Sequence, residues 1–356
     1  MTITLHQLLK AAVKQGASDI HITAGSPPVL RVEGRIVRVK AGELNADDTR
    51  QLCYSILTDA QKSRFEATKE LDFSFGIKSM ARFRANLFFQ RGAVSGVFRR
   101  IPMDVPDIEM LGLPKVVSDV VSYPTGLVLV TGPTGSGKTT TIAALVDKIN
   151  RERRSHIITL EDPIEHVHPH KSCIVNQREV GVDTVSYRSA LKHVLRQDPD
   201  VCMMGELRDL ETIDAALNIC ETGHLVFATL HTNSAISTIT RIVNVFPSDQ
   251  QDRVRLQLSL TLNTVVSQRL IPGPQGGMAL ALEVLVMNPS LRNLVRENKL
   301  HQMYGMMQVG QDKTGMITLN QSLLQLVMKR KIDVRSAFAY SADPEELDKM
   351  LKTAGV

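Results

Sequence analysis

The sequence lacks several features that would mark common classes of protein. It has no tryptophan and only 4% aromatic residues, so stacking surfaces for single-stranded nucleic acid are scarce. The four cysteines (Cys53, Cys173, Cys202 and Cys220) form no C-x-x-C pair, which argues against a zinc site or a disulfide framework. No apolar run approaches the ~20 residues of a membrane span, and the N-terminus lacks the apolar stretch of a signal peptide. We therefore expect a cytosolic chain without an integral membrane segment.

The composition that is present is typical of a globular protein. With 356 residues, 43% of them hydrophobic and 22% charged, the chain is long for one core, and two domains are expected. The net charge of +5 is only mildly basic. It permits contact with an anionic surface or nucleic acid but requires neither.

Residues 1–100 predict a small α/β domain that begins with an amphipathic helix. Short strands are expected at 20–22, 29–32 and 35–39. Glu33 and Gly34 would form the hairpin turn between the last two strands. A helix is expected over Asp47–Glu66. Alternating apolar and polar residues then predict an antiparallel pair of strands over 81–90 and 93–100.

A second domain is predicted beyond a linker. Residues 101–114 contain three prolines without periodicity, which is typical of a linker. From 115 to 356 buried strands alternate with helices, which predicts a mostly parallel sheet. These strands are expected at 126–131, 156–160, 201–205 and 225–230. The chain after about Val254 predicts helices.

The segment 132–139, GPTGSGKT, matches the P-loop pattern between a predicted strand and a predicted helix. Its glycines allow backbone N–H groups to surround a polyphosphate at the positive end of the helix. Lys138 would reach the outer phosphates, and the Thr139 hydroxyl would complete a Mg²⁺ shell. The predicted nucleotide-binding residues are Gly132, Pro133, Thr134, Gly135, Ser136, Gly137, Lys138, Thr139 and Thr140.

Acidic residues follow two of the predicted strands, at the sheet edge where ligands bind. Glu161, Asp162 and Glu165 come after 156–160, and Glu206 comes after 201–205. Beside a P-loop, Glu161 and Asp162 can hold Mg²⁺ through water, and Glu206 can polarise the attacking water with help from Glu165 or Glu161. A solvated acidic loop is the alternative for the first group, and a purely structural role is the alternative for Glu206.

Two histidines flank the predicted strand 225–230. His231 closes the strand at the predicted phosphate edge and is a candidate sensor of the γ-phosphate. His224 is a weaker candidate for contact with the nucleotide. A histidine at a strand end can also be an ordinary hydrogen-bonding residue, and that alternative stays open for both.

Three arginines of the first domain form another candidate group. Arg82 and Arg84 project from one face of a predicted strand about 7 Å apart, and Arg99 lies on the strand paired with it. A ring-shaped ATPase needs cations supplied by a neighbour to stabilise charge on the transferred phosphoryl group. A solvated basic face is the alternative.

Together these motifs resemble the secretion-type ATPases, the GspE/PilT family, and most closely its type IV pilus retraction ATPases. The motifs that carry the resemblance are GASDIHI (16–22), GPTGSGKT (132–139), LEDPIEHVH (160–168), DPDVCMMGELRD (198–209), ETGHLVFATLHTN (221–233) and SQRLI (267–271). The resemblance implies a PAS-like N-terminal domain and a RecA-like ATPase core with a helical C-terminal part. It also implies ATP and Mg²⁺ as cofactors and a homohexameric ring in which each site takes arginines from a neighbour.

Residues 290–297, SLRNLVRE, are similar to the AIRNLIRE motif of retraction motors. Asn288 would cap this helix, with Arg292 and Arg296 on its outer face. The N-terminal extra domain and four-cysteine zinc site of extension motors are not expected here.

The resemblance therefore implies pilus retraction and twitching motility, with the chain peripheral at the inner membrane on a PilC-like platform protein. A second retraction ATPase is a possible partner, and no nucleic acid is expected. Three alternatives stay open: a nucleic-acid translocase on the same core, a non-hydrolysing ring subunit and an auxiliary retraction ATPase.

Overall fold

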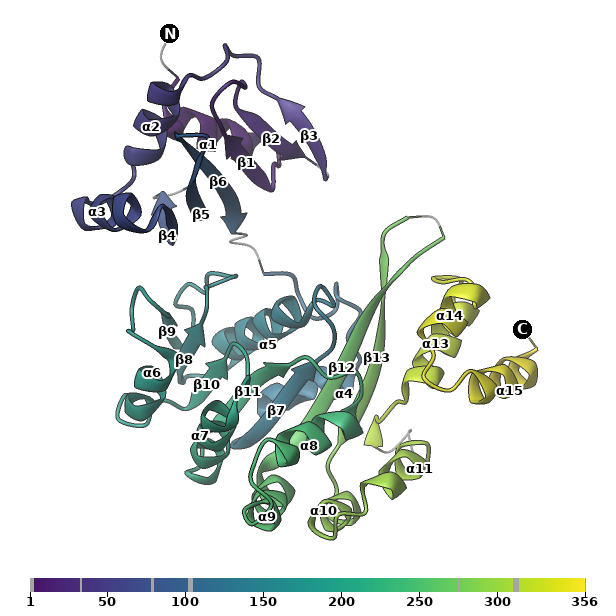
Figure 1. Cartoon of the computed structure of the whole chain (residues 1–356). Coiled ribbons are helices and arrows are strands. Elements are labelled where there is room, and N and C mark those ends of the chain that lie inside the picture. The colour runs from purple at the N-terminus through teal and green to yellow at the C-terminus, as the bar shows by residue number, and fades with distance from the viewer. Residues whose placement is uncertain are drawn as a thin grey trace. The chain divides into compact units, whose positions relative to one another are not determined.

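The computed structural model describes residues 3–32, 34–77, 80–101, 105–274, 276–309 and 314–355. The chain divides into two compact units (Figure 1). Unit 1 comprises Met1–Asp104 and Glu165–Val167, and unit 2 comprises Val105–Ile164 and His168–Val356. Each unit contains its own sheet and its own helices, which confirms the predicted α/β fold class.

Among the described residues of unit 1, an antiparallel sheet has the strand order β3-β2-β1-β6-β5-β4. Its strands are β1 Asp19–Ile22, β2 Val29–Val32, β3 Arg35–Arg38, β4 Glu70–Ile77, β5 Ala81–Gln90 and β6 Ala93–Ile101. Its helices are α1 Leu5–Lys14, α2 Ala46–Tyr54 and α3 Asp59–Thr68. Of the predicted hairpin turn, Glu33 lies outside the described residues.

The helix expected over 47–66 is interrupted. The chain leaves α2 at Ser55 and starts α3 after Thr58, whose hydroxyl accepts from the Gln61 backbone N–H while the Gln61 side chain accepts from the Thr58 N–H. This capping box gives α3 its own start. Continuous apolar spacing did not reveal the break.

The alternation in β5 separates the two faces of this sheet. Phe83, Ala85 and Leu87 are fully buried in a core shared with apolar residues of α1, α2 and α3. The intervening Arg82 and Arg84 point to the opposite face. Burial of one face therefore fixes the register that displays the arginines on the other.

Among the described residues of unit 2, a sheet has the strand order β13-β12-β7-β11-β10-β8-β9. All neighbours pair in parallel except β12 and β13. The strands are β7 Gly126–Thr131, β8 His156–Glu161, β9 Ile174–Glu179, β10 Val201–Met204, β11 Leu225–Leu230, β12 Leu262–Pro272 and β13 Met278–Val286. The first helices are α4 Lys115–Ser118, η1 Asp119–Ser122, α5 Lys138–Glu152, α6 Tyr187–Val194, α7 Leu210–Glu221, α8 Ala235–Asn244 and α9 Gln251–Thr261.

The prediction of helices alone after Val254 is wrong over 262–286, where β12 and β13 form a long hairpin. The run LNTVVSQRLIP is rich in β-branched residues and β12 extends the parallel sheet beside β7, so tertiary pairing decides its conformation. In the described residues after β13, the named elements are helical. They are α10 Pro289–Arg296, η2 Leu300–Gln302, α11 Met303–Met307, α13 Leu319–Met328, α14 Val334–Tyr340 and α15 Pro344–Ala354.

The two faces of this sheet have separate cores. Val128 and Val130 of β7 pack against α5, whereas Leu127 and Leu129 pack against the helices of the other face. Because both faces are covered, the parallel strands are continuously apolar, as expected of a doubly wound sheet. No helix in the described part of the chain is both long and apolar enough to cross a membrane.

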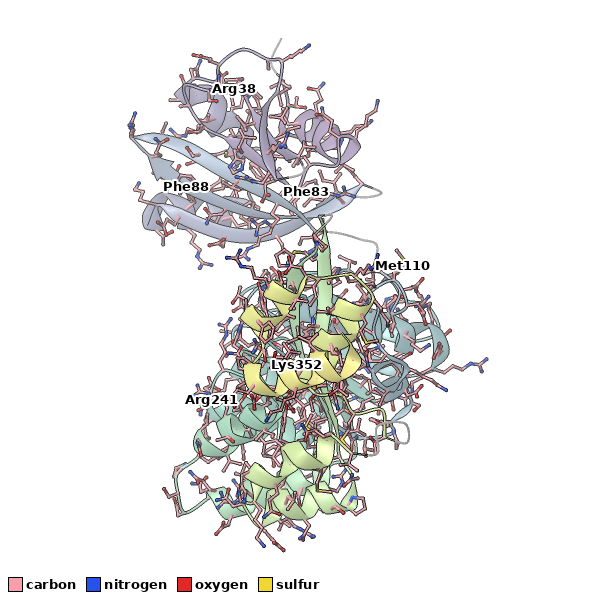
Figure 2. The ribbon with its side chains drawn as sticks, turned by 90° about the vertical axis from the view of Figure 1, so that its right-hand side faces the viewer. Arg38, Phe83, Phe88, Met110, Arg241 and Lys352 are labelled. Atoms are coloured by element: carbon pink, nitrogen blue, oxygen red, sulfur yellow. The ribbon has the colours of Figure 1, made fainter. Side chains whose placement is uncertain are left out.

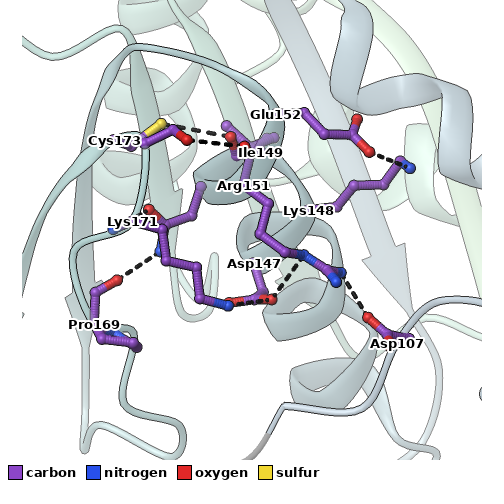
Figure 3. Close-up of polar contacts among 11 residues, drawn as sticks. Asp107, Asp147, Lys148, Ile149, Arg151, Glu152, Pro169, Lys171 and Cys173 are labelled. Atoms are coloured by element: carbon purple, nitrogen blue, oxygen red, sulfur yellow. Dashed lines mark hydrogen bonds and ion pairs between the residues drawn. The ribbon is translucent and has the colours of Figure 1, made fainter.

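Much of the segment expected to be a linker packs within unit 2. Ile108 and Leu113 are buried in the α5 side of the core. Arg151 of α5 binds Asp107 at 2.6 Å and also contacts Asp147, which in turn accepts from Lys171 (Figure 3). Residues 102–104 lie outside the described part. The second half of the segment is therefore fixed to the helix that follows the P-loop.

Candidate nucleotide-binding and catalytic site

The loop 132–137 connects the end of β7 to the start of α5, as the motif predicts. Gly132, Gly135 and Gly137 have φ angles of +142°, +78° and +84°. A Cβ atom on Gly132 would lie 2.3 Å from the Gln268 carbonyl oxygen and 2.6 Å from the Ser136 Oγ. Only glycine fits at Gly132, because both the backbone angle and the neighbouring atoms exclude a side chain.

The loop is suited to an anion. Lys138 is buried, and its Nζ donates to the carbonyl oxygens of Gly132 at 2.9 Å and Pro133 at 3.0 Å. No described side chain caps the N-terminus of α5, so its first N–H groups face the loop. The Oγ of buried Ser136 also has no hydrogen-bond partner among the described residues. These donors fit a polyphosphate, whose oxygens would satisfy them.

His231 links the P-loop lysine to Glu206. Its Nδ1 lies 3.5 Å from the Lys138 Nζ, and its Nε2 lies 3.2 Å from the Glu206 Oε1. An ammonium group only donates, so we assign Nδ1 as the acceptor and place the proton on Nε2, which donates to Glu206. The predicted proximity of these residues follows from the sheet, since Thr131 and Leu230 end β7 and β11 in register.

Glu206 follows β10 and is held in place by its neighbours. Its second carboxylate oxygen, Oε2, accepts from the Arg208 Nε at 2.8 Å. The preceding Gly205 carbonyl accepts from the Thr229 Oγ1 at 2.5 Å, and its N–H donates to Leu160. The Glu206 side chain is about one quarter exposed, so water can reach it.

Glu161 ends β8 beside this segment. It is buried, and its Oε1 accepts from the Thr159 Oγ1 at 2.6 Å and from the Gln177 Nε2 at 3.1 Å. Asp162 is exposed and Thr139 is half-buried. Among the described residues no group of three or more His, Cys, Asp or Glu side chains is placed to hold a metal ion. Glu165 is exposed and belongs to unit 1.

The structure does not bring His224 to the P-loop. This residue precedes β11, and its Nδ1 contacts the Ile219 carbonyl at 3.1 Å and the Thr222 Oγ1 at 3.0 Å. The six residues of β11 separate it from the loop edge, a distance on the order of 20 Å in an extended strand. Within unit 2, His224 therefore connects the C-terminal end of α7 to the amino-terminal end of β11, away from the P-loop.

The three predicted arginines share one face of the unit 1 sheet. Arg84 lies directly opposite Arg99. The Arg99 Nε donates to buried Asp19 at 2.8 Å, and Arg84 lies 3.8 Å from Asp72. The Arg82 Nη2 donates to the Ser74 Oγ at 2.8 Å. Opposed like charges destabilise a sheet, and Asp19 and Asp72 offset that repulsion.

Sequence reasoning missed the role of Gln268 in β12. Its Nε2 donates to the Ser136 carbonyl at 2.6 Å, so it supports the P-loop from the side. The only signal was the family element SQRLI, which assigns no contact. A pocket of about 1150 Å³ lies beside these residues. It extends from Gly137 and Thr140 past Leu270 to Met110 and Lys329.

The expectation that Arg292 lies on the outer face of its helix is wrong. Asn288 caps α10 as predicted, but the Arg292 Nη1 donates to the carbonyls of Ser259 at 2.5 Å and Leu260 at 3.0 Å. The residue thus caps the C-terminus of α9, where the helix dipole favours a cation. Burial lowers the pKa of Arg292. Helical periodicity alone cannot reveal this long-range contact.

The doubly wound sheet, the P-loop and the Lys138–His231–Glu206 contacts define a P-loop ATPase. The family model for the Type II/IV secretion system protein matches residues 1–338, and the chain belongs to this family. The predicted ATPase class and the family resemblance are confirmed.

Named relatives include the type IV pilus retraction ATPase PilT of Pseudomonas aeruginosa. It is 48% identical over 95% of this chain and 98% of its own length. The type IV pilus ATPase PilU of the same organism is 40% identical over 97% of this chain and 91% of its own.

Solved structures of two ATPases match the fold of this chain. The pilus retraction motor PilT with bound ADP matches with a TM-score of 0.92 and 49% identity, covering 98% of this chain and all of that one. The ATPase DotB of Legionella pneumophila matches with a TM-score of 0.82 and 25% identity, covering 95% of this chain and 96% of its own.

Proposed function

We propose that this chain is the ATP-hydrolysing motor that powers retraction of type IV pili. The observation that carries the proposal is the contact series from the P-loop Lys138 through His231 to Glu206. Near full-length similarity to the retraction ATPase PilT supports the assignment of this ATPase to retraction. A nucleic-acid translocase on the same core is not favoured.

ATP would bind with its phosphates on residues 132–140 and its base and ribose in the adjoining pocket. Phosphate oxygens would take the place of the loop carbonyls that now accept from Lys138. The Thr139 hydroxyl, with Glu161 and Asp162 acting through water, would hold Mg²⁺. The metal would supply positive charge to the phosphate oxygens during transfer.

Glu206 would position and deprotonate the attacking water. Its partners His231 and Arg208 fix both carboxylate oxygens, which sets the direction of the group before substrate binds. His231 would report the outer phosphate, because any movement of the Lys138 ammonium toward phosphate alters the contact at Nδ1. Glu165 stays a proposed assistant to Glu206.

We further propose a homohexameric ring in which Arg82, Arg84 and Arg99 act on a neighbour's phosphates. Their position on one face of a sheet supports this role. The proposed domains are a PAS-like domain over 1–100 and a RecA-like ATPase domain over 115–356. The segment 101–114 is the proposed linker between them, with its second half packed within unit 2. His224 keeps no part in the proposed single-subunit site.

In the cell, the motor would be cytoplasmic and peripheral at the inner membrane, acting on a PilC-like platform protein to withdraw pilin subunits. Similarity to PilU as well as PilT keeps an auxiliary retraction ATPase as a second candidate. Such a chain would depend on a main motor and would be a partner to it.

Two experiments test this function. The purified chain should release phosphate from ATP with Mg²⁺, without stimulation by DNA or RNA. Deleting its gene in a piliated cell should leave surplus fibres that do not retract, and twitching should return only with a hydrolysing copy. Bald cells would contradict retraction and favour extension. Normal retraction in the single mutant, lost only with a second ATPase gene, would favour the auxiliary role.

A further inference from the structure

The short loop that carries His231 (residues 231–234, the histidine loop) and the start of the helix after it are held by two side chains of the β12–β13 hairpin. These are Arg269 of β12 and Glu283 of β13. Neither belongs to the P-loop or to the acidic motifs. Arg269 contacts the loop itself at Asn233, whereas Glu283 contacts Ala235, the first residue of α8 directly after the loop. Each of the two side chains also interacts with a C-terminal helix.

Glu283 joins two helix N-termini. It is buried, and its Oε1 accepts from the backbone N–H of Ala235, the first residue of α8, at 2.6 Å. Burial raises the pKa of this carboxyl, and the backbone N–H groups of Ala235 and of Leu319, the first residue of α13, act against that shift by favouring its charged form. An anion at a helix N-terminus is stabilised by the helix dipole. One carboxylate therefore ties the start of α8 to the start of α13.

Arg269 makes the matching connection through carbonyl oxygens. Its Nη2 donates to the Asn233 carbonyl at 3.4 Å, and its Nη1 donates to the carbonyl of Tyr340, the last residue of α14, at 2.9 Å. The arginine also interacts electrostatically with Glu283. Asn233 and Ala235 lie two and four residues after His231, so both contacts restrain the loop close to that ring.

We propose that Arg269 and Glu283 are positioning residues that set His231 against Glu206 from the C-terminal helices α13 and α14. This rests on the proposed function, since it assigns a means of control to the same site. The preceding residue, Gln268, supports the P-loop. The hairpin thus holds the histidine loop and the phosphate loop together. Movement of α13 or α14 would change the rate of hydrolysis through His231 rather than the capacity to bind nucleotide.

Steady-state hydrolysis by the full-length chain, together with its affinity for ATP, tests the proposal. Arg269→Gln and Glu283→Gln should lower kcat roughly tenfold or more, because small misplacements of a catalytic group are costly. Affinity for ATP should change by less than about twofold, since the phosphate loop is untouched. The conservative Arg269→Lys, whose ammonium can hold one carbonyl well, should recover part of the lost rate.

Arg241→Gln is the matched control, because Arg241 is an exposed arginine of α8 (Figure 2). Its kcat should equal that of the wild type. If wild type and control both fail to hydrolyse ATP, the proposed function is wrong. If both are active and the Arg269 and Glu283 variants are equally active, the positioning role is wrong.

A double-mutant cycle separates positioning from general structural support. In a His231→Ala background, Arg269→Gln should cause little further loss of kcat, because the two residues act through one ring. If the double variant loses kcat by the product of the factors lost in the two single variants, the proposal is overturned. If Glu283→Gln proves unstable to heating, the kcat values of Arg269→Gln and Arg269→Lys decide whether the positioning role holds.

Discussion

The two sheets present their functional candidates in different ways. In unit 2 the strands β7, β10 and β11 are parallel, and Lys138, Glu206 and His231 follow these three strands at their carboxyl ends. In unit 1 the strands are antiparallel, and Arg84 and Arg99 stand in mid-strand on a face. Parallel topology gathers strand ends into a site by itself. A mid-strand side chain acquires a catalytic role only from what approaches its face.

The local contacts show the same difference. His231 contacts both Lys138 and Glu206, and the loop around Lys138 fits a phosphate ligand. Arg99 and Arg84 are each paired with an acid of their own unit. The first group therefore forms one contact series within unit 2, whereas the ion pairs of the second group lie within unit 1. The role of the arginines on a neighbour's phosphates is a proposal.

The largest expected effect tests the unit 2 side of this comparison. Glu206→Gln should reduce kcat about 10³-fold, because an amide cannot take a proton from water. ATP binding should stay near the wild-type level, since Lys138 and the loop are intact. Phosphate release and nucleotide affinity measure the two quantities. Glu345→Gln, an exposed acid of α15, is the control. Normal turnover by Glu206→Gln would remove it from the chemistry.

The next effect tests whether the unit 1 arginines act across subunits. Arg84→Gln and Arg99→Gln should each lower kcat on the order of 10²-fold. This loss is smaller than that expected for a single arginine finger, because Arg82, Arg84 and Arg99 would together stabilise the charge on the phosphoryl group. Arg38→Gln, at an exposed position of β3, should have no effect (Figure 2).

Mixing subunits then distinguishes a catalytic role of the unit 1 arginines in a neighbouring subunit from a merely solvated basic face. Neither Arg84→Gln nor Lys138→Ala rings should hydrolyse ATP well alone. Mixed rings should regain activity where an intact arginine faces an intact P-loop. No recovery on mixing, with mixed rings demonstrated, would leave the arginines as a solvated face.

A smaller effect is expected from backbone geometry. Gly132→Ala should weaken ATP binding about tenfold or more, because its Cβ would collide with the Gln268 carbonyl. Gly42→Ala in unit 1 is the control, since no atom lies within 4 Å of its Cβ. Titration with a fluorescent ATP analogue measures both. Equal affinities would show that the loop adjusts freely.

The smallest effect concerns Asp19, the buried acid that pairs with Arg99. Burial raises its pKa, but hydrogen bonds from Arg99 and Ser18 outweigh this, and the net shift is downward from 3.8. Asp19→Asn should destabilise unit 1 by about 1–3 kcal/mol at neutral pH through loss of a charge-assisted hydrogen bond.

The sign of the pH dependence follows from that lowered pKa. Stability contributed by the Asp19 carboxylate is complete above 3.8 and is lost as pH falls through the lower folded-state value. Thermal unfolding of wild type and Asp19→Asn should therefore converge on acidification below 3.8. A gap that stays constant or widens would contradict the ion-pair account.

The predictable part of the molecule is the part that local sequence determines. The P-loop, the strands β7, β8, β10 and β11 and the positions of Glu206 and His231 followed from glycine pattern, apolar runs and strand-end placement. The hairpin β12–β13 did not, because its conformation depends on pairing with β7. Arg292, Gln268 and Arg269 act on backbone carbonyls distant in sequence, and no periodicity encodes such contacts.

His224 shows a further limit. Both histidines flank β11 and are candidates from the sequence for contact with the nucleotide, but the length of the strand separates the two residues in space. Motif membership alone therefore does not place a residue at the site. The position of the residue relative to the carboxyl end of its strand does.

Magnesium-dependent nucleotide binding by Lys138→Ala tests the central claim most directly. The wild-type chain should retain an ATP analogue, and the alanine variant, with its fold verified by circular dichroism, should lose affinity roughly 100-fold because a buried phosphate charge loses its cation. Equal retention of the ATP analogue by the two proteins would contradict the claim that the loop 132–139 is the site of ATP binding.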